Sequence, residues 1–324
     1  MPIRLARASD LPAISACCAA GFANDELFSN LIHPRRQQYP ADYVAFWHRR
    51  NRENWWDWAH TYIVATEQDE NGNEIIVGVA EWEKQGPNAT GLWRWDPRRL
   101  MKPLQILRNA VSSYFFPNRA AHSPEALTIF HRAFPFFSHI WQSMSPTGTR
   151  RDNGYYLDLL AIDPRFHRRG LGRLLCNWGI DKARREGVCA SVVASGDAES
   201  KGFYQSVGFV TPAGRATEGE GNPLSGYPLG ANAIIKGGLI LFMDAPSSGE
   251  AKEEVVETSG VMVEMEEERY GHVGVDIVTN RKSEWREGKS VTVTVTEFGE
   301  TSEFTEVMEV KGIRNENSAV TEVR

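Results

Sequence analysis

The first 86 residues alternate between strand-like and helix-like patterns of apolar and polar positions. Ile3–Arg7 alternates as a short strand, and Ser9–Pro12 then supplies an N-cap with a proline in the first turn, so we predict a helix through Ala20. A second helical stretch, rich in aromatic residues and arginines, covers Ala41–Trp58. A turn sequence joins the next two β-rich runs into a predicted hairpin: Thr61–Thr66 and Ile75–Glu83.

The middle of the chain, residues 87–150, interrupts this rhythm with helical periodicity. Large apolar residues recur at helical spacing from Leu100 through Leu104, Leu107 and Val111 to Phe115. A second helix-like run covers Pro124–Trp141. We therefore expect residues 87–150 to form a helical insertion.

The pattern returns to alternating strands and helices after residue 150. It predicts, in chain order, a strand, a helix, a strand, a short helix and a last apolar strand: Tyr155–Ile162, Gly170–Arg185, Val188–Ala194, Lys201–Val207 and Gly238–Asp244. The whole order of elements predicts an α/β architecture with a mixed sheet.

Composition places the chain among globular proteins and excludes several classes. Of its 324 residues 41% are apolar and 24% charged, which suffices for a sizeable core. We expect no membrane span, because no run of 18 apolar residues occurs, and no secretory signal, because the first residues lack an apolar stretch. The cysteines suit neither a disulfide framework nor a zinc site: Cys17, Cys18, Cys176 and Cys189. We expect a reducing compartment, the cytoplasm, with the nucleus as the alternative.

Charge divides the chain into a mildly basic body and an acidic tail. Residues 250–324 hold 18 acidic and 9 basic residues, which leaves 24 acidic and 27 basic residues for 1–249. The run Pro246–Glu250 is linker-like, so we expect a domain over residues 1–246 and a tail over 247–324. Ser290–Thr296 alternates as a strand does, but the tail has few large apolar residues, and we expect it to be largely disordered. It is either a solvated appendage or a partner-binding segment.

One loop between a predicted strand and a predicted helix combines glycines with arginines, a combination that suits phosphate binding. His167-Arg168-Arg169-Gly170-Leu171-Gly172-Arg173 lies between a predicted strand and a predicted helix. The glycines allow a tight turn and leave amide N–H groups uncovered, and the helix N-terminus adds unsatisfied donors. Such a loop is either an anion cradle or a glycine-containing helix start with exposed arginines. It matches neither the Walker loop nor the complete G-x-G-x-x-G fingerprint.

Together with a second motif, this loop resembles the Gcn5-related N-acetyltransferases, the GNAT family. His167–Gly172 is similar to the family's Q/R-x-x-G-x-G/A, with His167 at the position of the usual glutamine or arginine. Phe203–Phe209 reads FYQSVGF and is similar to F-Y-x-x-x-G-F. The motifs cover about 155–209, and the order of elements covers 3–245. The resemblance implies an α/β (α+β) fold with a mixed, mostly antiparallel sheet, a central splayed strand pair, flanking helices and, here, the helical insertion.

The resemblance also implies acetyl-CoA as cosubstrate and names the residues that bind it. The backbone of Leu160, Ala161 and Ile162 would hold the pantetheine arm, and Ser195 would contact it from the next strand. The pyrophosphate would lie on the loop amides, carried by His167, Arg168, Arg169, Gly170, Leu171, Gly172 and Arg173. No metal is implied.

Direct acetyl transfer requires a base, an oxyanion donor and an acid for the departing thiolate. Tyr204 holds the family's usual general-acid position and is also implied as a cofactor-binding residue; its alternative role is packing of its helix. Asp158, on the central strand with Tyr156 on the same face, is one candidate base. Glu81, on the preceding strand, is its rival and would act through water. Cys176 and Cys189 fall within predicted helix and strand, so we interpret them as core residues and expect no acyl-enzyme.

The acceptor is an amine, of either a small molecule or a peptide. Aromatic residues near the expected acceptor region suit an apolar, flat or choline-like amine, or else only pack the insertion onto the body: Trp47, Trp55, Trp56, Trp58, Trp93 and Trp95. The body's small positive charge gives no support to nucleic-acid binding. Two functions stay open: an acetyl-CoA-dependent N-acetyltransferase, or a non-catalytic acyl-CoA-binding or protein-interaction module on the same fold.

Overall fold

The computed structural model describes residues 2–86, 89, 100–194, 198–225, 228–229, 233–234, 238–245, 294–297 and 300–303. The chain divides into two compact units, Met1–Ser247 and Ser248–Arg324. In the second unit the described residues form one antiparallel pair, β10 (Thr294–Glu297) and β11 (Glu300–Glu303). Part of the predicted strand Ser290–Thr296 is thus extended, and the predicted disorder of the tail lies outside the described residues.

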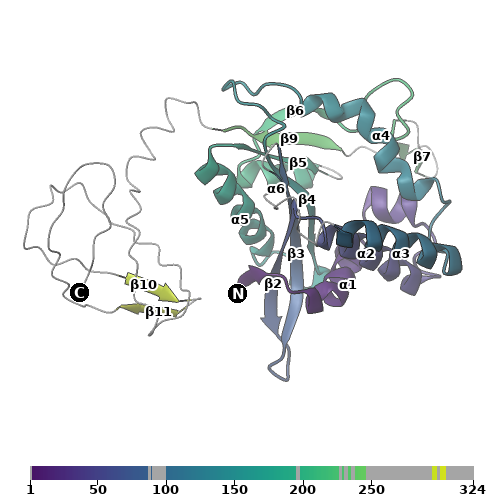
Figure 1. The fold of residues 1–324 in the computed structure, drawn as a ribbon, viewed down its shortest axis with the longest axis horizontal. Helices are drawn as coiled ribbons and strands as arrows, with labels where there is room; N and C mark the ends of the chain where they lie inside the picture. Colours follow the sequence, from purple (N-terminus) through teal and green to yellow (C-terminus); the bar gives the residue numbers. More distant parts are fainter. Residues whose placement is uncertain are drawn as a thin grey trace, which may run out of the picture. The chain divides into compact units, whose positions relative to one another are not determined.

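The first unit is built on a seven-stranded sheet in the order β1-β2-β3-β4-β5-β9-β6 (Figure 1). Every neighbouring pair is antiparallel except β4 and β5, which are parallel. The strands run as follows: β1 Ile3–Leu5, β2 His60–Gln68, β3 Glu74–Gln85, β4 Gly154–Ile162, β5 Cys189–Ala194, β6 Thr211–Arg215 and β9 Leu239–Met243. The expected mixed, mostly antiparallel sheet is confirmed.

The parallel pair at the centre separates before its strands end. β4 and β5 pair only over Gly154–Leu157 and Cys189–Val192, although β4 continues to Ile162. On the other edge of β4, Glu81 lies opposite Leu159 and Trp82 opposite Leu157, so Asp158 is the extra residue of a β-bulge. A bulge bends its strand, and this one lies where β4 leaves β5. The expected splayed strand pair is therefore present.

Helices cover both faces of the sheet (Figure 1). One face carries α1 (Leu11–Gly21) and α2 (Pro40–Trp55), and their core is formed by residues such as Ile14, Trp47 and Val79. The opposite face carries α5 (Leu171–Glu186) and α6 (Ala198–Val207), packed on Trp82 and Leu157. A Cβ at Gly179 of α5 would lie 2.2 Å from the Trp82 ring, so glycine allows this helix to approach the sheet.

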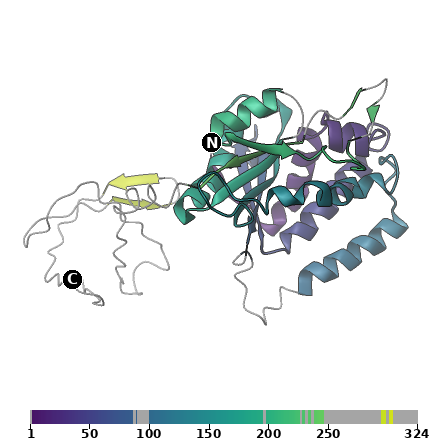
Figure 2. The same cartoon turned by 90° about the horizontal axis from the view of Figure 1, so that it is seen from above.

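The predicted insertion contains two helices with different surroundings. α4 (Ile129–Phe137), between the 3-10 turns Ala126–Thr128 and Ser138–Ile140, packs Phe137 into a core with Trp141 and Phe242. The helix-like run predicted over Pro124–Trp141 is thus divided into three short helical elements. α3 (Met101–Phe115) is a helix as its periodicity predicts, and it lies at the periphery of the first unit (Figure 2). Most of its large apolar side chains are exposed, whereas Gln105 is buried. No helix of the described residues is long and apolar enough to cross a membrane.

Three features have no counterpart in the prediction. A π-helical segment, Glu26–Ile32, follows α1, and the Asp25 carboxylate caps it by accepting hydrogen bonds from the amides of Leu27 and Phe28. β6 forms an edge strand although its sequence, TPAGR, contains proline and glycine. A two-residue pair, β7 (Pro228–Leu229) with β8 (Ala233–Ile234), stands outside the main sheet.

Candidate active site

The loop after β4 presents a run of backbone amides. A 3-10 turn, Pro164–Phe166, leads from β4 to Leu171, where α5 begins. Among the described residues, no acceptor is present for any of the amides of residues 168–173, whereas the Leu174 amide donates to the Gly170 carbonyl at 3.2 Å. Free N–H groups at a helix N-terminus attract anions, because the helix dipole adds partial positive charge there. The loop therefore has the donors that a phosphate group needs.

Two left-handed residues shape this run. Gly170 has φ 80° and Arg168 has φ 61°, and Arg168 is the only non-glycine with positive φ among the described residues. Such a backbone turns successive N–H groups toward one side and forms a concave anion site. A Cβ at Gly170 would meet no atom within 4 Å, so glycine is needed there for its conformation and not for space.

The side chains around the loop are mostly cationic and exposed. The Arg168 guanidinium makes no hydrogen bond with the described residues, and Arg169 lies 3.5 Å from Glu67. Arg173 donates to the carbonyl and hydroxyl of Ser206 at 2.9 and 3.1 Å, which ties the start of α5 to the end of α6. His167 Nε2 lies 3.1 Å from the Ile162 carbonyl oxygen, across the turn. Positive charge thus surrounds the free amides.

The predicted pantetheine residues lie on the free edge of β4. Leu160, Ala161 and Ile162 pair with β3 on one side and lie beyond the last residue paired with β5. Ala161 is buried, while Leu160 and Ile162 are half-buried. Parallel strands that separate in this way leave backbone groups between them without a strand partner. This free edge leads directly to the amide loop through the β4–α5 turn.

Tyr204 lies on α6, at the same end of the structure as the start of α5. Its ring is half-buried and makes edge contacts with Phe203 and Phe209, at centroid distances of 5.2 and 6.0 Å. Among the described residues its hydroxyl has no hydrogen-bond partner. Burial raises the pKa of Tyr204, so the phenol keeps its proton at neutral pH. A protonated, unengaged hydroxyl is able to act as an acid.

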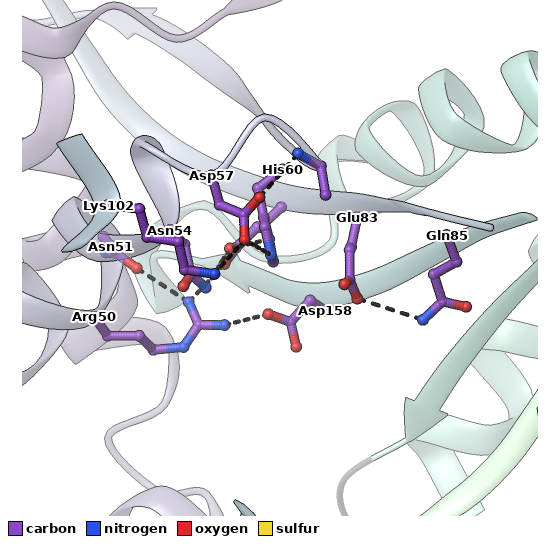
Figure 3. A network of polar contacts seen from close by, with 11 residues as sticks. Arg50, Asn51, Asn54, Asp57, His60, Glu83, Gln85, Lys102 and Asp158 are labelled. Carbon is purple, nitrogen blue, oxygen red and sulfur yellow. Dashed lines mark hydrogen bonds and ion pairs between the residues drawn. The ribbon is translucent and has the colours of Figure 1, made fainter. Parts of the chain in front are cut away.

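The two candidate bases belong to one polar network centred on Arg50 of α2 (Figure 3). The Arg50 guanidinium donates to Glu81 Oε2 and to Asp158 Oδ2, each at 2.6 Å. Asn54, one turn further along α2, donates to Glu81 Oε1 at 2.7 Å, and His60 Nδ1 lies 2.8 Å from the same oxygen. The structure therefore brings Glu81 and Asp158 together on the two sides of one cation.

The pKa values of Glu81, His60 and Asp158 are shifted differently by this network. Burial opposes ionisation of Glu81, but Arg50 and His60 hold its pKa well below the usual range. Burial also opposes the charge of His60, yet the Glu81 carboxylate raises its pKa from 6.5 to about 9. Burial raises the pKa of Asp158, Arg50 opposes this and the Glu81 charge adds to it. Glu81 is thus a fixed anion, and Asp158 is the carboxylate whose proton affinity is increased.

Accessibility separates the two carboxylates further. The Glu81 side chain is 0% exposed, whereas that of Asp158 is 22% exposed. Asp158 Oδ1 has no hydrogen bond with the described residues, since only Oδ2 accepts from Arg50. Asp158 thus has one carboxylate oxygen without a described donor, whereas both oxygens of Glu81 are engaged.

Sequence reasoning did not identify several members of this site. Arg50, His60 and Tyr62 come from α2 and β2, and the register that places His60 opposite Glu83 and Tyr62 opposite Glu81 is a property of the folded sheet. Glu83 is partly buried, and burial raises its pKa. The sequence signal that was available is the two-residue spacing of Glu81 and Glu83, which places both on one face of β3.

Three side chains of the network also lie close enough together to hold a metal ion: His60, Glu81 and Asp158. One potential ligand atom of each lies within 4.8 Å of the others. However, the Arg50 guanidinium already donates to both carboxylates, so a positive charge occupies the position of a bridging cation. The chemistry of this donor set fits an ion-pair network better than a metal site.

The remaining predicted residues have different surroundings. Trp55 is partly buried against the core under α2, and Trp58 is 41% exposed. All four cysteines are buried, and burial raises the pKa of the Cys176 thiol to about 12, which suits a core residue and not a nucleophile. Trp47 is also a core residue and stacks on Phe22 at 4.9 Å. Ser195, Trp93 and Trp95 lie outside the described residues.

A family model matches the segment that carries the amide loop, Asp158 and Tyr204. Residues 133–209 match the Acetyltransferase (GNAT) family, and they include β4, the amide loop, α5, β5 and Tyr204. This part of the chain is a GNAT acetyltransferase domain. The family assignment made from the two motifs is confirmed, and the GNAT family uses acetyl-CoA and acetylates amines. No curated protein matches the chain.

Solved structures similar to the chain are GNAT acetyltransferases. A histone acetyltransferase HPA2 and related acetyltransferase from Corynebacterium glutamicum is 18% identical over 75% of this chain and 96% of its own, with a TM-score of 0.43. A GNAT acetyltransferase from Brucella melitensis in complex with acetyl-CoA is 14% identical over 64% and 81%, with a TM-score of 0.31. Naa20 of Chaetomium thermophilum, in complex with a bisubstrate analogue, is 15% identical over 80% and 94%, with a TM-score of 0.34. Identities this low say nothing of the acceptor of this protein.

Proposed function

We propose that this protein is an acetyl-CoA-dependent N-acetyltransferase that transfers the acetyl group directly to the primary amine of a small molecule or peptide. Residues 1–246 form its catalytic domain. The observation that carries the proposal is the run of unpaired amides at residues 168–173, at the start of α5 and next to the free edge of β4.

The amide run supports cofactor binding because its chemistry matches a diphosphate. The free N–H groups and the helix dipole bind one anionic group, and Arg168 and Arg169 add charge around it. In the proposed complex, the backbone of Leu160, Ala161 and Ile162, which pairs with β3 on one side only, holds an extended polar chain that leads from the loop toward Asp158. The thioester then lies between β4 and α6, within the reach of groups on both.

In the proposed reaction, Asp158 and Tyr204 move the two protons. Asp158 accepts a proton from the amine as its nitrogen bonds to the thioester carbonyl carbon, and Tyr204 donates a proton to the sulfur as the C–S bond breaks. Glu81 is not the base in this scheme: together with Asn54 and His60 it fixes Arg50, and Arg50 positions Asp158. Each transfer is direct, so no cysteine takes part.

A thiol-release assay with acetyl-CoA and an amine panel tests the function, and calorimetry with acetyl-CoA tests binding separately. We expect both acetyl-CoA binding and amine-dependent thiol release. Binding without turnover on any amine would favour a non-catalytic acyl-CoA-binding module. Absence of binding would overturn the proposal as a whole.

A further inference from the structure

A pocket of about 630 Å³ lies beside the polar network, between α2, α3 and the segment 117–128. Phe46, Arg49, Arg50, Glu53 and Asn54 line it along one stripe of α2. Their spacing of three, one, three and one residues is that of a single helix face, which extends over about 12 Å at 1.5 Å per residue. The pocket is therefore an elongated site with α2 as one wall.

Two residues of this stripe belong to the polar network: Arg50 at its middle and Asn54 at its C-terminal end. Arg50 donates to Asp158 and Glu81, and Asn54 donates to Glu81, while both residues also line the pocket. A molecule in the pocket would thus have one end at the network that holds the proposed base. The other end of the stripe, toward Phe46, lies away from it.

The lining carries uncompensated positive charge. Among the described residues, Arg35 and Arg49 form no ion pair: Arg35 donates to the Ala121 carbonyl and Arg49 to the Phe116 carbonyl at 2.9 Å. Each guanidinium has five N–H donors, so most of them stay available. Glu53 is the only acidic residue of the lining, and it accepts a hydrogen bond from Asn109 at 3.1 Å. Asp42, near Arg49, is bound to Arg119 on two oxygens.

The rest of the lining is suited to a small organic molecule. Phe46, Pro117, Pro124 and Leu127 supply apolar surface, while Asn118 and Ser123 are polar. Two guanidinium groups without carboxylate partners disfavour a cationic acceptor and favour an anionic one, because the fork of N–H donors matches carboxylate or phosphate oxygens. The charge of the lining argues against a choline-like acceptor.

We propose that this pocket is the acceptor site and that it selects an amine carrying an anionic group, a carboxylate or a phosphate, which Arg49 and Arg35 bind. The amino end then lies at Asp158, about two helical turns or less from the anion. This inference rests on the proposed function, and it adds the class of acceptor.

Paired acceptors that differ only in the anionic group test the inference. The carboxylate pair is 5-aminopentanoate and 5-aminopentanamide, and the phosphate pair is 3-aminopropyl phosphate and 3-aminopropanol; in each pair the distant amines have similar basicity. We expect kcat/KM to be about tenfold or more higher for the anionic member of at least one pair, which also tells carboxylate from phosphate. Equal rates within both pairs, or preference for the neutral members, would overturn the inference and leave the N-acetyltransferase function intact.

Arginine variants connect this preference to the pocket. In Arg49→Gln and Arg35→Gln we expect this preference to be mostly lost: kcat/KM for the anionic acceptor should be no more than about three times that for the neutral acceptor. Arg184→Gln, on the exposed side of α5 across the sheet, makes the same charge change and serves as control, with an unchanged ratio. A ratio that is the same in the Arg49 and Arg184 variants would refute the assignment of the anion to Arg49.

Calorimetry provides a readout that does not need turnover. If no amine is acetylated, the proposed function fails, and the pocket is tested with pentanoate and pentanamide as ligands. Binding of pentanoate that is lost in Arg49→Gln, with a melting temperature within a few degrees of the wild type, supports the anion site. Failure of pentanoate and of inorganic phosphate to bind the wild-type protein overturns it.

Discussion

The charge of His60 makes the stability of this protein depend on pH. In the structure His60 lies 2.8 Å from the buried Glu81 carboxylate, and its side chain is 10% exposed. The Glu81 charge raises the pKa of His60 from 6.5 to about 9 in spite of burial. A group whose folded-state pKa is raised stabilises the fold below its unfolded pKa and loses that contribution as pH rises through the folded pKa.

The magnitude follows from the two pKa values. Each tenfold difference in proton affinity corresponds to about 1.4 kcal/mol, so a change from 6.5 to about 9 is worth at most about 3 kcal/mol. This contribution is complete below pH 6.5 and absent above pH 9. We therefore expect His60→Gln to lower the free energy of unfolding by up to about 3 kcal/mol at pH 6 and by much less at pH 9.5.

Urea unfolding of wild type and His60→Gln between pH 6 and 9.5 measures this difference. The difference between the two proteins isolates His60, because other groups titrate in both. His131→Gln, at an exposed position of α4, is the matched control and should destabilise the protein far less than His60→Gln at pH 6. A destabilisation by His60→Gln that is equal at pH 6 and pH 9.5 would refute a charged His60 paired with Glu81.

Three further predictions concern the proposed reaction. Tyr204→Phe should lower kcat by about a hundredfold or more and leave the Kd of acetyl-CoA unchanged in calorimetry, because only the proton donor is lost. An unchanged kcat would remove Tyr204 from the mechanism. Gly170→Ala should weaken acetyl-CoA binding, because alanine disfavours the left-handed backbone that shapes the loop. Gly187→Ala is the control: Gly187, at the other end of α5, also has a left-handed backbone and open space around it, so this variant should lose similar stability but keep the Kd of acetyl-CoA. Equal Kd values for the two variants would refute the amide cradle. Asp158→Asn should remove the acidic limb of the pH profile of kcat/KM, and Asp152→Asn, at the partly exposed partner of Arg150, should keep it; a retained limb in Asp158→Asn assigns the base to another group.

Most of the local structure could be predicted from the sequence because it depends on neighbouring residues. The strand β4 and the helix α5 follow from hydrophobic periodicity over eight to sixteen residues, and their observed bounds, Gly154–Ile162 and Leu171–Glu186, differ from the predicted ones by one residue. The amides of residues 171–173, which have no acceptor among the described residues, follow in the same way, since a helix N-terminus leaves its first N–H groups without partners wherever it occurs. The loop chemistry was therefore present in the sequence.

The acid–base network was decided by the tertiary structure. Arg50, His60, Glu81 and Asp158 are separated by up to 108 positions, and nothing in their spacing shows that one guanidinium lies between two carboxylates. Their meeting depends on the register of β2, β3 and β4, on the bulge at Asp158 and on the packing of α2 against that face. The edge strand β6 was missed for a related reason: its pairing with β9 outweighs the weak strand propensity of its own residues.

The sequence by itself determined most of the helices and strands and the glycine-containing loop before α5, because each of these depends on residues within a few positions of one another. Only the tertiary structure decided which carboxylate is fixed by ion pairs, which one is accessible, and that the apolar stripe of α3 is exposed to solvent. Burial and electrostatic environment arise when distant segments pack together, and the proton affinity of a side chain depends on both.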